Sequence, residues 1–258
     1  MLSPPTKQEA LLGAQLHLPA NVRLACQAEV AGEGVIQLRR IIHDENDIGL
    51  YIGHDPNVSD AQLGEEKESV LFFLDIRNFT SFTETHLAFD VIHIIRKLFA
   101  YFNGIIVSNG GRILETTGDG LYATFEGDGN PVQAVQAAVQ SGLSIIAGLE
   151  VLNPAYFVPH FGAPVWVGIG IHSGRVISGG VLLGDEEHTV VMGHAVNIAA
   201  RLQNATKELN NSLLVSEDVY RQLIHRSATP PPSALLRLKG ISEPMTVYLM
   251  GQPYPERD

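Results

Sequence analysis

The sequence predicts an α+β domain in which an antiparallel β-sheet is backed by two helices. Three observations predict it: the continuous apolar run SVLFFLDI (69–76), two long segments with apolar residues three and four apart, and a hairpin pattern between them. The order strand, helix, strand, strand, helix, strand is that of a split β-α-β unit.

The run 69–76 is short and uninterrupted, as in a strand that is buried at the centre of a sheet. The helix after it ends at Gly110-Gly111, because glycine commonly follows the last helical residue. Its apolar positions are Val91, Ile94, Ile95, Leu98, Phe99, Phe102 and Ile105. Strands 112–117 and 121–125 then form the hairpin.

The second helix begins at Asn130-Pro131, because Asn is a favoured N-cap and Pro a favoured first helical residue. Its apolar positions are Val132, Val135, Val139, Leu143 and Ile146. An irregular link with three prolines (150–164) precedes the strand VWVGIGIH (165–172). The later expected elements are a strand 175–183, a helix 195–209, a strand 213–216, and paired strands near 235–239 and 245–250.

The first 55 residues form a small unit with a polar, proline-rich start. The elements expected in it are a helix around Glu9–Leu16 and strands near Ala25–Val30 and Val35–Arg40. A polar segment with turn residues and no apolar period follows, which predicts a linker. The expected domains are therefore the N-terminal segment 1–55, the linker 56–68, the main domain 69–250 and a tail 251–258.

Composition excludes several partners and compartments. Of 258 residues 45% are apolar and 17% charged, as in a globular protein, and the net charge of −11 argues against nucleic acid as a partner. The single cysteine, Cys26, excludes an internal disulfide and an all-cysteine metal site, which favours a reducing cytoplasm. We expect no membrane, since the N-terminus lacks signal-peptide order and no apolar run approaches the roughly 20 residues that span a bilayer.

Two acids are expected at one end of the sheet. Asp75 closes the central strand, and Asp119 lies at the hairpin tip, which this topology places beside that strand. Two acids without neighbouring His or Cys form an oxygen-ligand site suited to Mg²⁺ or Mn²⁺, to which the carbonyl of Ile76 could add a ligand. The structural alternative is that Asp119 is a turn residue and Asp75 a helix cap.

The residues around these acids suit a bulky anion. Gly118 and Gly120 lack a Cβ, which allows a tight turn and a close approach of the backbone to a ligand. The stretch RNFTSF directly after the strand begins a helical segment, whose first amides, at Asn78, Phe79 and Thr80, could bind phosphate. Asn78 tolerates the left-handed conformation that such a turn needs.

The segment GHAVNIAARLQNATKEL (193–209) predicts a helix with a polar pair. Its apolar face comprises Ala195, Ile198, Ala199, Leu202, Ala205 and Leu209. Asn197 and Arg201, four residues apart, then lie side by side on the other face. An amide beside a guanidinium is suited to orienting a sugar and stabilising charge on a phosphate, although a merely solvated face gives the same pattern.

Five ordered motifs resemble the class III nucleotidyl cyclases, the adenylate and guanylate cyclase catalytic domains. They are FFLDIRNFTSFTE (72–84), GGRILETTGDGLYATF (110–125), VGIGIHSGRVISGGV (167–181), VVMGHAVNIAARL (190–202) and LKGISEPMTVYLM (238–250). The resemblance covers about residues 69–250 and implies a ferredoxin-like palm of the nucleotidyl cyclase type. It also implies that the ribose 3′-hydroxyl of ATP or GTP attacks its own α-phosphate, giving a 3′,5′-cyclic nucleotide and pyrophosphate.

The resemblance assigns roles to the matching positions. Asp75 and Asp119 resemble the acids that bind two Mg²⁺ or Mn²⁺ ions per site. Asn197 and Arg201 resemble the ribose-orienting and transition-state residues, and Lys239 the lysine that contacts the terminal phosphates. In this family the acids and the Asn/Arg pair come from different subunits, which implies a head-to-tail homodimer with two shared active sites.

Glu115 falls where this family places the residue that reads the purine base. Guanine N1–H and its 2-amino group are donors, so a carboxylate favours GTP, whereas adenine N1 is an acceptor. The second base-reading position matches Val190, whose side chain makes no hydrogen bond, or after a one-residue shift Thr189 or His188. ATP and GTP both stay open as substrates. If this pocket no longer orients the nucleotide, the chain is instead a catalytically weak or inactive nucleotide-binding regulator.

The N-terminal segment has a resemblance of its own. SPPTKQEALLG…VRLACQAEV is similar to the last third of a [2Fe-2S] ferredoxin domain, with Cys26 at the position of the final cluster ligand. Because the other three cysteines are missing, we expect no iron–sulfur cluster. The chain is then either a fragment or carries a degenerate ferredoxin-like remnant.

Overall fold

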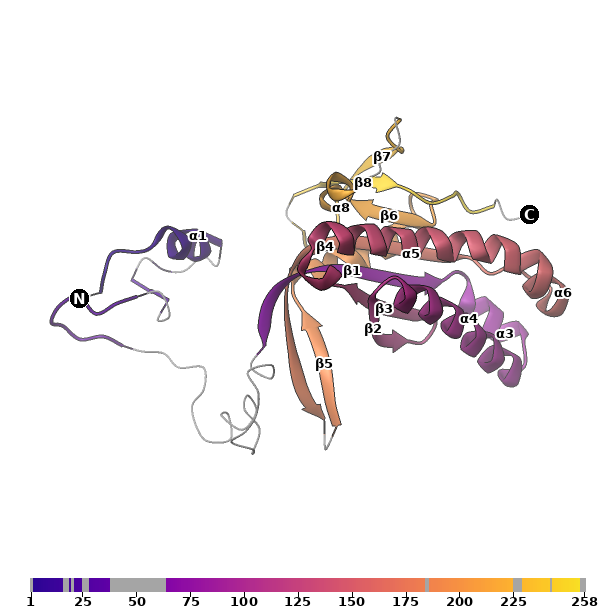
Figure 1. The fold of residues 1–258 in the computed structure, drawn as a ribbon, viewed down its shortest axis with the longest axis horizontal. Helices are drawn as coiled ribbons and strands as arrows, with labels where there is room; N and C mark the ends of the chain where they lie inside the picture. Colours follow the sequence, from indigo (N-terminus) through magenta and orange to yellow (C-terminus); the bar gives the residue numbers. More distant parts are fainter. Residues whose placement is uncertain are drawn as a thin grey trace. The chain divides into compact units, whose positions relative to one another are not determined.

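The chain is shown as a computed structural model in Figure 1. The residues that the structure describes are 2–15, 19, 21–24, 28–37, 64–183, 186–224, 229–241 and 243–255. The chain divides into two compact units, Met1–Pro56 and Asn57–Asp258.

The larger unit is built on an eight-stranded sheet. Its strands are β1 (Glu65–Ile76), β2 (Gly111–Thr117), β3 (Gly120–Phe125), β4 (Val167–Leu183), β5 (Glu186–Met192), β6 (Leu213–Ser216), β7 (Ser233–Leu236) and β8 (Met245–Leu249). The order across the sheet is β2-β3-β1-β4-β6-β8-β7, and β5 pairs with β4 as a hairpin (Figure 1). The antiparallel strands β2, β3, β1 and β4 confirm the predicted split β-α-β order. β4 and β6 are parallel, because α7 (His194–Ala205) lies in the connection between them.

Helices cover both faces of this sheet. α4 (Ala88–Ser108) and α5 (Pro131–Leu152) pack on one face, where they bury Phe72 and Leu74 of β1. α7 packs on the other face, against Leu71 and Phe73. The two cores separate in this way because successive side chains of a strand point to opposite faces.

The predicted start of α5 is confirmed in detail. The side-chain oxygen of Asn130 accepts hydrogen bonds from the N–H groups of Val132 (3.1 Å) and Gln133 (3.3 Å), and Pro131 is the first helical residue. The cap satisfies donors that have no partner within the helix.

The link 150–164, expected to be irregular, is helical as far as Phe161. α5 continues into a π-helical turn, Asn153–Phe157, and then into α6 (Val158–Phe161). A proline lies in the first turn of each of these two segments, where the missing N–H is tolerated. Asn153 closes the link, since its side chain accepts from the N–H of Val165 at 2.7 Å and donates to its carbonyl at 3.0 Å.

The predicted start of the central strand is wrong by four residues. β1 begins at Glu65, inside the expected linker 56–68. The charged residues 65–68 join the strand because their backbone pairs with residues 175–178 of β4. The sequence did not predict this part of the strand, because the side chains of residues 65–68 are polar and only the main-chain pairing with β4 makes them a strand.

The two strands expected at 165–172 and 175–183 are one strand of 17 residues, β4. Ser173 and Gly174, which resemble a turn in sequence, continue the pairing with β1. Other differences are that α7 ends at Ala205, that the strand expected near 235–239 ends at Leu236, and that β5 and α8 (Glu217–Gln222) were not predicted.

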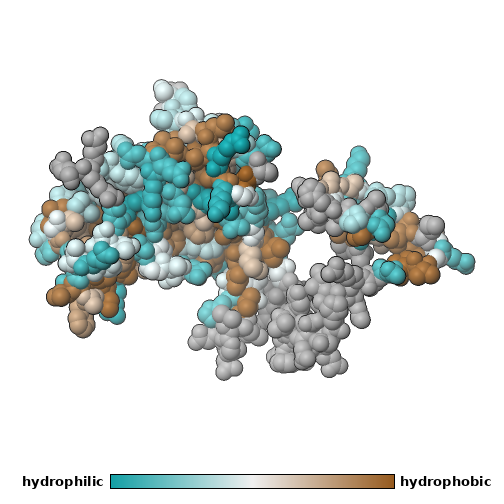
Figure 2. All heavy atoms as spheres, turned by 180° about the vertical axis from the view of Figure 1, so that it is seen from behind, coloured by the Kyte–Doolittle hydropathy of each residue, from teal (hydrophilic) through white to brown (hydrophobic). Residues whose placement is uncertain are grey.

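The β4–β5 hairpin exposes apolar side chains. Ile177, Val181 and Met192 are large hydrophobic residues on its surface. Figure 2 shows hydrophobic atoms on this hairpin beside hydrophilic ones, on a face where the two kinds are interspersed.

Two helical runs, α4 and Pro131–Phe161, are apolar and long enough to cross a membrane by length and composition alone. This differs from the expectation that the chain has no apolar stretch of such length. Some of the apolar residues of each helix are buried in the core. They include Leu98 and Phe102 of α4 and Val135 and Leu149 of α5.

The smaller unit contains an ion pair in its described part. Glu9 of α1 (Lys7–Gln15) accepts from Nε and Nη2 of Arg23 at 2.5 and 2.7 Å. These hydrogen bonds lower the pKa of Glu9 to about 2. α1 confirms the helix expected near Glu9.

The strands expected in the smaller unit are only partly testable. Val30 forms a single bridge with Leu2, and residues 35–37 form no strand. Residues 25–27, with Cys26 among them, and 38–40 lie outside the described residues. The ferredoxin-like remnant therefore stays a prediction.

Candidate active site

The end of β1 meets the tip of the β2–β3 hairpin. Asp75 pairs with Gly120, and the N–H of Ile76 donates to the carbonyl of Asp119 at 3.2 Å. This confirms the prediction that Asp119 lies beside the end of the central strand.

The two acids interact electrostatically. Burial raises the pKa of Asp75, and the negative charge of Asp119 raises it further, whereas the charges of Lys207 and Arg77 act in the opposite direction. The side chain of Asp75 is 29% exposed, so it is accessible to a ligand. A cation between the two carboxylates would remove the repulsion between them.

The donor set fits Mg²⁺ or Mn²⁺. The groups predicted as ligands, Asp75, Asp119 and the carbonyl of Ile76, are all oxygen donors, and the described residues contain no cluster of three or more His, Cys, Asp and Glu side chains. Mg²⁺ is commonly held by one or two carboxylates together with substrate phosphates, and oxygen donors alone suit it.

The two glycines of the hairpin tip are needed for different reasons. Gly118 has φ 61°, a left-handed conformation that glycine adopts without strain. A Cβ on Gly120 would lie 3.5 Å from Oδ1 of Asp75 and 3.2 Å from the carbonyl oxygen of Leu74. The lack of a side chain at Gly120 thus keeps space beside the acid.

The turn after β1 has the predicted geometry. Asn78 has φ 57° and ψ 25°, in the left-handed region, and begins α3 (Phe79–Thr85). The N–H groups of Phe79 and Thr80 belong to the first turn of this short helix, where main-chain donors have no intrahelical partner.

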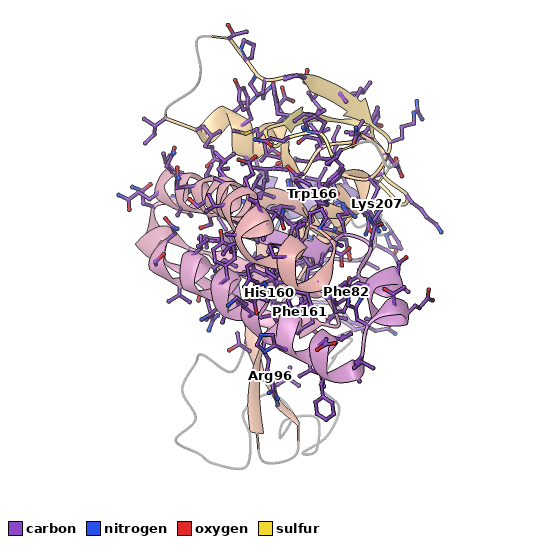
Figure 3. The ribbon with its side chains drawn as sticks, turned by 90° about the vertical axis from the view of Figure 1, so that its right-hand side faces the viewer. Phe82, Arg96, His160, Phe161, Trp166 and Lys207 are labelled. Atoms are coloured by element: carbon purple, nitrogen blue, oxygen red, sulfur yellow. The ribbon has the colours of Figure 1, made fainter. Side chains whose placement is uncertain are left out.

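Aromatic contacts hold α3 against α6. The ring of Phe82 lies edge-on to Phe161 with centroids 6.4 Å apart, as Figure 3 shows at the meeting point of the two helices. Nε2 of His86 lies 3.1 Å from the carbonyl oxygen of Phe161. These contacts hold the second half of α3 against α6.

α7 presents Asn197 and Arg201 away from its buried face. Ala195, Ile198, Ala199, Leu202 and Ala205 of the predicted apolar face are buried, and Leu209 lies beyond the helix and is partly buried. The helix packs closely on β4, because a Cβ on Gly170 would lie 2.6 Å from the carbonyl oxygen of Ala199. The predicted polar pair is thus on the outer surface of the helix.

The turn with Lys239 approaches Arg201. Gly240 has φ 73°, and a Cβ on it would lie 3.3 Å from Nη2 of Arg201. The two residues predicted to bind phosphate, Arg201 and Lys239, therefore lie in the same part of the folded domain.

A β-bulge decides which way Glu115 faces. Leu114 is the extra residue between Ile113, which pairs with Ala123, and Glu115, which pairs with Tyr122. Ile113 packs in the core under α4 and α5, whereas Tyr122 packs in the core under α7. Glu115 is therefore exposed on the sheet face where Phe73 and Asp75 of β1 also lie.

The three candidates for the second base-reading position lie on β5. Val191 is buried under α7, so the strand period of two places Thr189 on the same side and Val190 and His188 on the other. Val190 pairs with Gly179 of β4 and is partly buried.

Sequence reasoning missed the residues that support Asp75. The positive charges of Lys207 and Arg77, and the nearby side chain of Gln203, oppose the burial that raises the pKa of Asp75. Nη1 of Arg77 lies 3.9 Å from Oδ2 of Asp75. Arg77 was visible in the sequence only as a basic residue two positions after the acid. Its contacts come from segments that are distant in the chain.

The family model of the adenylate and guanylate cyclase catalytic domain matches residues 63–251. The chain belongs to this family, as the fold and the meeting of the two acids also indicate. It is 31% identical over 192 residues to an adenylate cyclase of Anabaena cylindrica and 30% over 188 residues to the terminal-differentiation specific adenylate cyclase of Dictyostelium discoideum. Each match covers 70% of this chain, but only 36% and 8% of those relatives.

Solved cyclase structures share the fold. The adenylyl cyclase CyaB from P. aeruginosa has a TM-score of 0.65 at 24% identity, over 75% of this chain and 97% of that one. The guanylyl cyclase Cya2 has a TM-score of 0.64 at 22% identity, over 72% and 92%. The guanylyl cyclase domain of the RhoGC fusion protein from Blastocladiella emersonii, described as a non-canonical dimer, has a TM-score of 0.57 at 24% identity, over 72% and 98%. Adenylyl and guanylyl cyclases are both among these similar structures, so the similarity does not show whether the substrate of this chain is ATP or GTP.

Proposed function

We propose that the chain is a purine nucleotide cyclase, which converts ATP or GTP to the 3′,5′-cyclic nucleotide and pyrophosphate and so feeds cyclic-nucleotide signalling. The observation that carries the proposal is the meeting of Asp75 and Asp119 in a domain of the cyclase family. Two carboxylates that repel each other at the open end of a sheet favour a divalent cation together with a polyphosphate.

Asp75, Asp119 and the carbonyl of Ile76 would hold two Mg²⁺ or Mn²⁺ ions, whose chemistry when bound is to activate a ribose hydroxyl and neutralise triphosphate charge. The 3′-oxygen gives its proton to solvent water and forms a bond to the α-phosphorus. The bond from this phosphorus to the bridging oxygen breaks, and pyrophosphate leaves with that oxygen.

Other side chains bind and orient the nucleotide. Asn197 orients the ribose, Arg201 stabilises charge on the α-phosphate in the transition state, and Lys239 contacts the terminal phosphates. The first amides of α3, after Asn78, donate to phosphate oxygens.

The active unit in this proposal is a cytoplasmic head-to-tail homodimer with two shared sites. Within one chain Asp75 adjoins Gln203 at the C-terminal end of α7, about 9 Å along the helix from Asn197. Asn197 can therefore complete the site of a second copy, together with Arg201, which lies four residues further on the same outward face of α7. The exposed apolar side chains of the β4–β5 hairpin also suit a covered surface.

Glu115 is the proposed base-reading residue and favours GTP, because its carboxylate accepts hydrogen bonds from guanine N1–H and the 2-amino group. Initial rates on ATP and GTP, measured for the wild type and for Glu115→Lys, test this role. We expect the substitution to move the ratio toward ATP by at least about tenfold, the factor for a lost specific hydrogen bond to a charged group. An unchanged ratio would show that Glu115 does not contact the base.

The activity itself is tested with purified protein, Mn²⁺, and ATP or GTP, with product analysed by chromatography. We expect cyclic product from the wild type and from Glu150→Ala, an exposed substitution on α5, and a loss of about a hundredfold or more in Asp119→Ala. Circular dichroism checks that Asp119→Ala is folded. Full activity in this variant would mean that the metal assignment is wrong.

A nonenzymatic nucleotide-binding regulator is the second candidate. It is favoured by Val190, an apolar side chain where a hydrogen-bonding residue is expected. In that case GTP or ATP with Mn²⁺ would raise the melting temperature while no cyclic product forms.

A further inference from the structure

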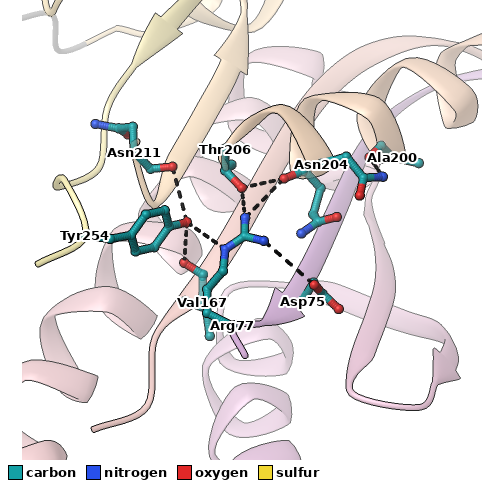
Figure 4. Close-up of polar contacts among 9 residues, drawn as sticks. Asp75, Arg77, Val167, Ala200, Asn204, Thr206, Asn211 and Tyr254 are labelled. Atoms are coloured by element: carbon teal, nitrogen blue, oxygen red, sulfur yellow. Dashed lines mark hydrogen bonds and ion pairs between the residues drawn. The ribbon is translucent and has the colours of Figure 1, made fainter. Parts of the chain in front are cut away.

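Arg77 lies beside Asp75, between β4 and the C-terminal end of α7 (Figure 4). Its side chain is only 6% exposed, and Nη1 lies 3.9 Å from Oδ2 of Asp75. Nη2 donates to Oγ1 of Thr206 and to the carbonyl of Gln203, the latter at 3.4 Å. The main-chain N–H of Arg77 donates to the carbonyl of Trp166 at 2.8 Å. The guanidinium is therefore held independently of Asp75.

A glycine makes room for this guanidinium. Gly168 of β4 is the cross-strand partner of Asp75. A Cβ on Gly168 would collide with Nη2 of Arg77 and with Oγ1 of Thr206. Arg77 thus occupies the place beside the carboxylate that a side chain at position 168 would otherwise take.

Tyr254 supports Arg77 from another side. Its hydroxyl accepts a hydrogen bond from Nε of Arg77 at 3.1 Å and lies 3.1 Å from the carbonyl oxygen of Val167, to which it donates (Figure 4). The Cζ atom of Arg77 lies 5.2 Å from the centroid of the tyrosine ring, within the range of a cation–π interaction.

Tyr254 belongs to residues 251–254, which we call the C-terminal strap. Three N–H groups of the strap donate to side chains of the loop before β6: Gly251 to Asn211 (3.0 Å), Gln252 to Ser212 (2.9 Å) and Tyr254 to Asn210 (3.1 Å). The strap is thus attached to the domain, although this segment was expected to be a tail. Tyr254 also lies beyond residues 63–251, which the family model matches.

The buried Nη1 atom of Arg77 makes no hydrogen bond within the described residues, and Asp75 is the carboxylate beside it. We propose that Arg77 is a positioning residue for Asp75 and that Tyr254 holds Arg77 in place, so that the C-terminal strap sets how tightly the site binds its divalent cation. The inference rests on the proposed function, in which Asp75 is a cation ligand. Arg77 acts through Asp75, because its buried guanidinium lies beside the carboxylate.

The effect should be on metal affinity. Residues that hold a metal ligand in its binding orientation typically change metal affinity or activity by about 10- to 100-fold when they are removed. Loss of the Tyr254 hydroxyl removes one hydrogen bond to Arg77, so a smaller effect of about fivefold is expected.

Tyr254→Phe is the least disturbing test. We expect the Mn²⁺ concentration for half-maximal cyclase activity to rise about fivefold, while the nucleotide KM at saturating Mn²⁺ stays within about twofold. Mn²⁺ binding without nucleotide, measured from the electron paramagnetic resonance signal of free Mn²⁺, should weaken by the same factor. Arg77→Gln should raise the midpoint by about tenfold or more. Arg77→Lys should recover only part of the loss, because lysine keeps the charge without the fork of donors.

Tyr101→Phe is the matched control. Its hydroxyl also donates to main-chain carbonyls, those of Ser144 and Ile145, but between α4 and α5. Equal Mn²⁺ midpoints in Tyr254→Phe and Tyr101→Phe would overturn the inference, and so would a raised nucleotide KM with an unchanged midpoint. A wild type that makes no cyclic product would contradict the proposed function instead, and Mn²⁺ binding would still test the positioning role.

Discussion

Acidification should destabilise the main domain through His172. This side chain of β4 is only 6% exposed, and its Nδ1 lies 2.8 Å from Oγ of Ser216. Burial lowers the pKa of His172 from 6.5 to about 4, a shift that the charge of Asp218 opposes and that of His194 increases. The folded domain therefore holds this histidine neutral at pH values where a free histidine is protonated.

The direction of the effect depends on which state binds more protons. Between pH 6.5 and about pH 4 the unfolded chain carries a proton on His172 that the folded chain lacks, so the free energy of unfolding falls as the pH falls. From pH 7 to pH 5 the loss is about 2 kcal/mol, because one pKa unit corresponds to about 1.4 kcal/mol. Below both pKa values the loss reaches a limit of about 3 kcal/mol.

Urea unfolding, followed by the fluorescence of Trp166, the only tryptophan in the sequence, measures this loss. The comparison is with His172→Asn, which can hydrogen-bond to Ser216 but does not titrate. The wild type should lose about 2 kcal/mol more than the variant between pH 7 and pH 5.

The variant serves as the control for other groups. The raised pKa of Asp75 acts in the opposite direction in both proteins, and the lowered pKa of Glu9, about 2, acts below this pH range. Equal losses in the wild type and His172→Asn would refute the reasoning.

Two other substitutions test the close contacts that build the site. Gly170→Ala should cost at least about 3 kcal/mol, because its Cβ would lie 2.6 Å from the carbonyl oxygen of Ala199 and push α7 off β4; a melting temperature equal to that of the wild type would contradict this packing. Asn78→Ala should cost about 1 kcal/mol in urea unfolding and Asn78→Gly less, because φ is 57° at this position; the reverse ranking would show that the left-handed turn is not what selects asparagine.

The sequence alone indicated the acids of the candidate site, because the signals for them are local. An apolar run that ends at Asp75, a Gly-Asp-Gly tip around Asp119 and a strand order known from helix and strand periods were enough to place the two carboxylates together. The left-handed turn at Asn78 was also predictable, since it depends on the conformational preference of one residue.

The direction of Glu115 could not be predicted in this way. Strict alternation would put it on the same face as Ile113, under α4 and α5, but the bulge at Leu114 turns it to the face of Asp75. A bulge depends on how two strands pair, and neither strand reveals it by itself.

The sequence by itself determined the central strand, the helices beside it, the family and the residues that carry the proposed chemistry. Only the tertiary structure decided the continuous length of β4, the face of Glu115, and the support of Asp75 by Arg77 and Tyr254. Arg77 and Tyr254 are 177 positions apart in the sequence. Local periodicity and turn preferences act over a few residues, whereas such a contact exists only after the sheet has brought distant segments together.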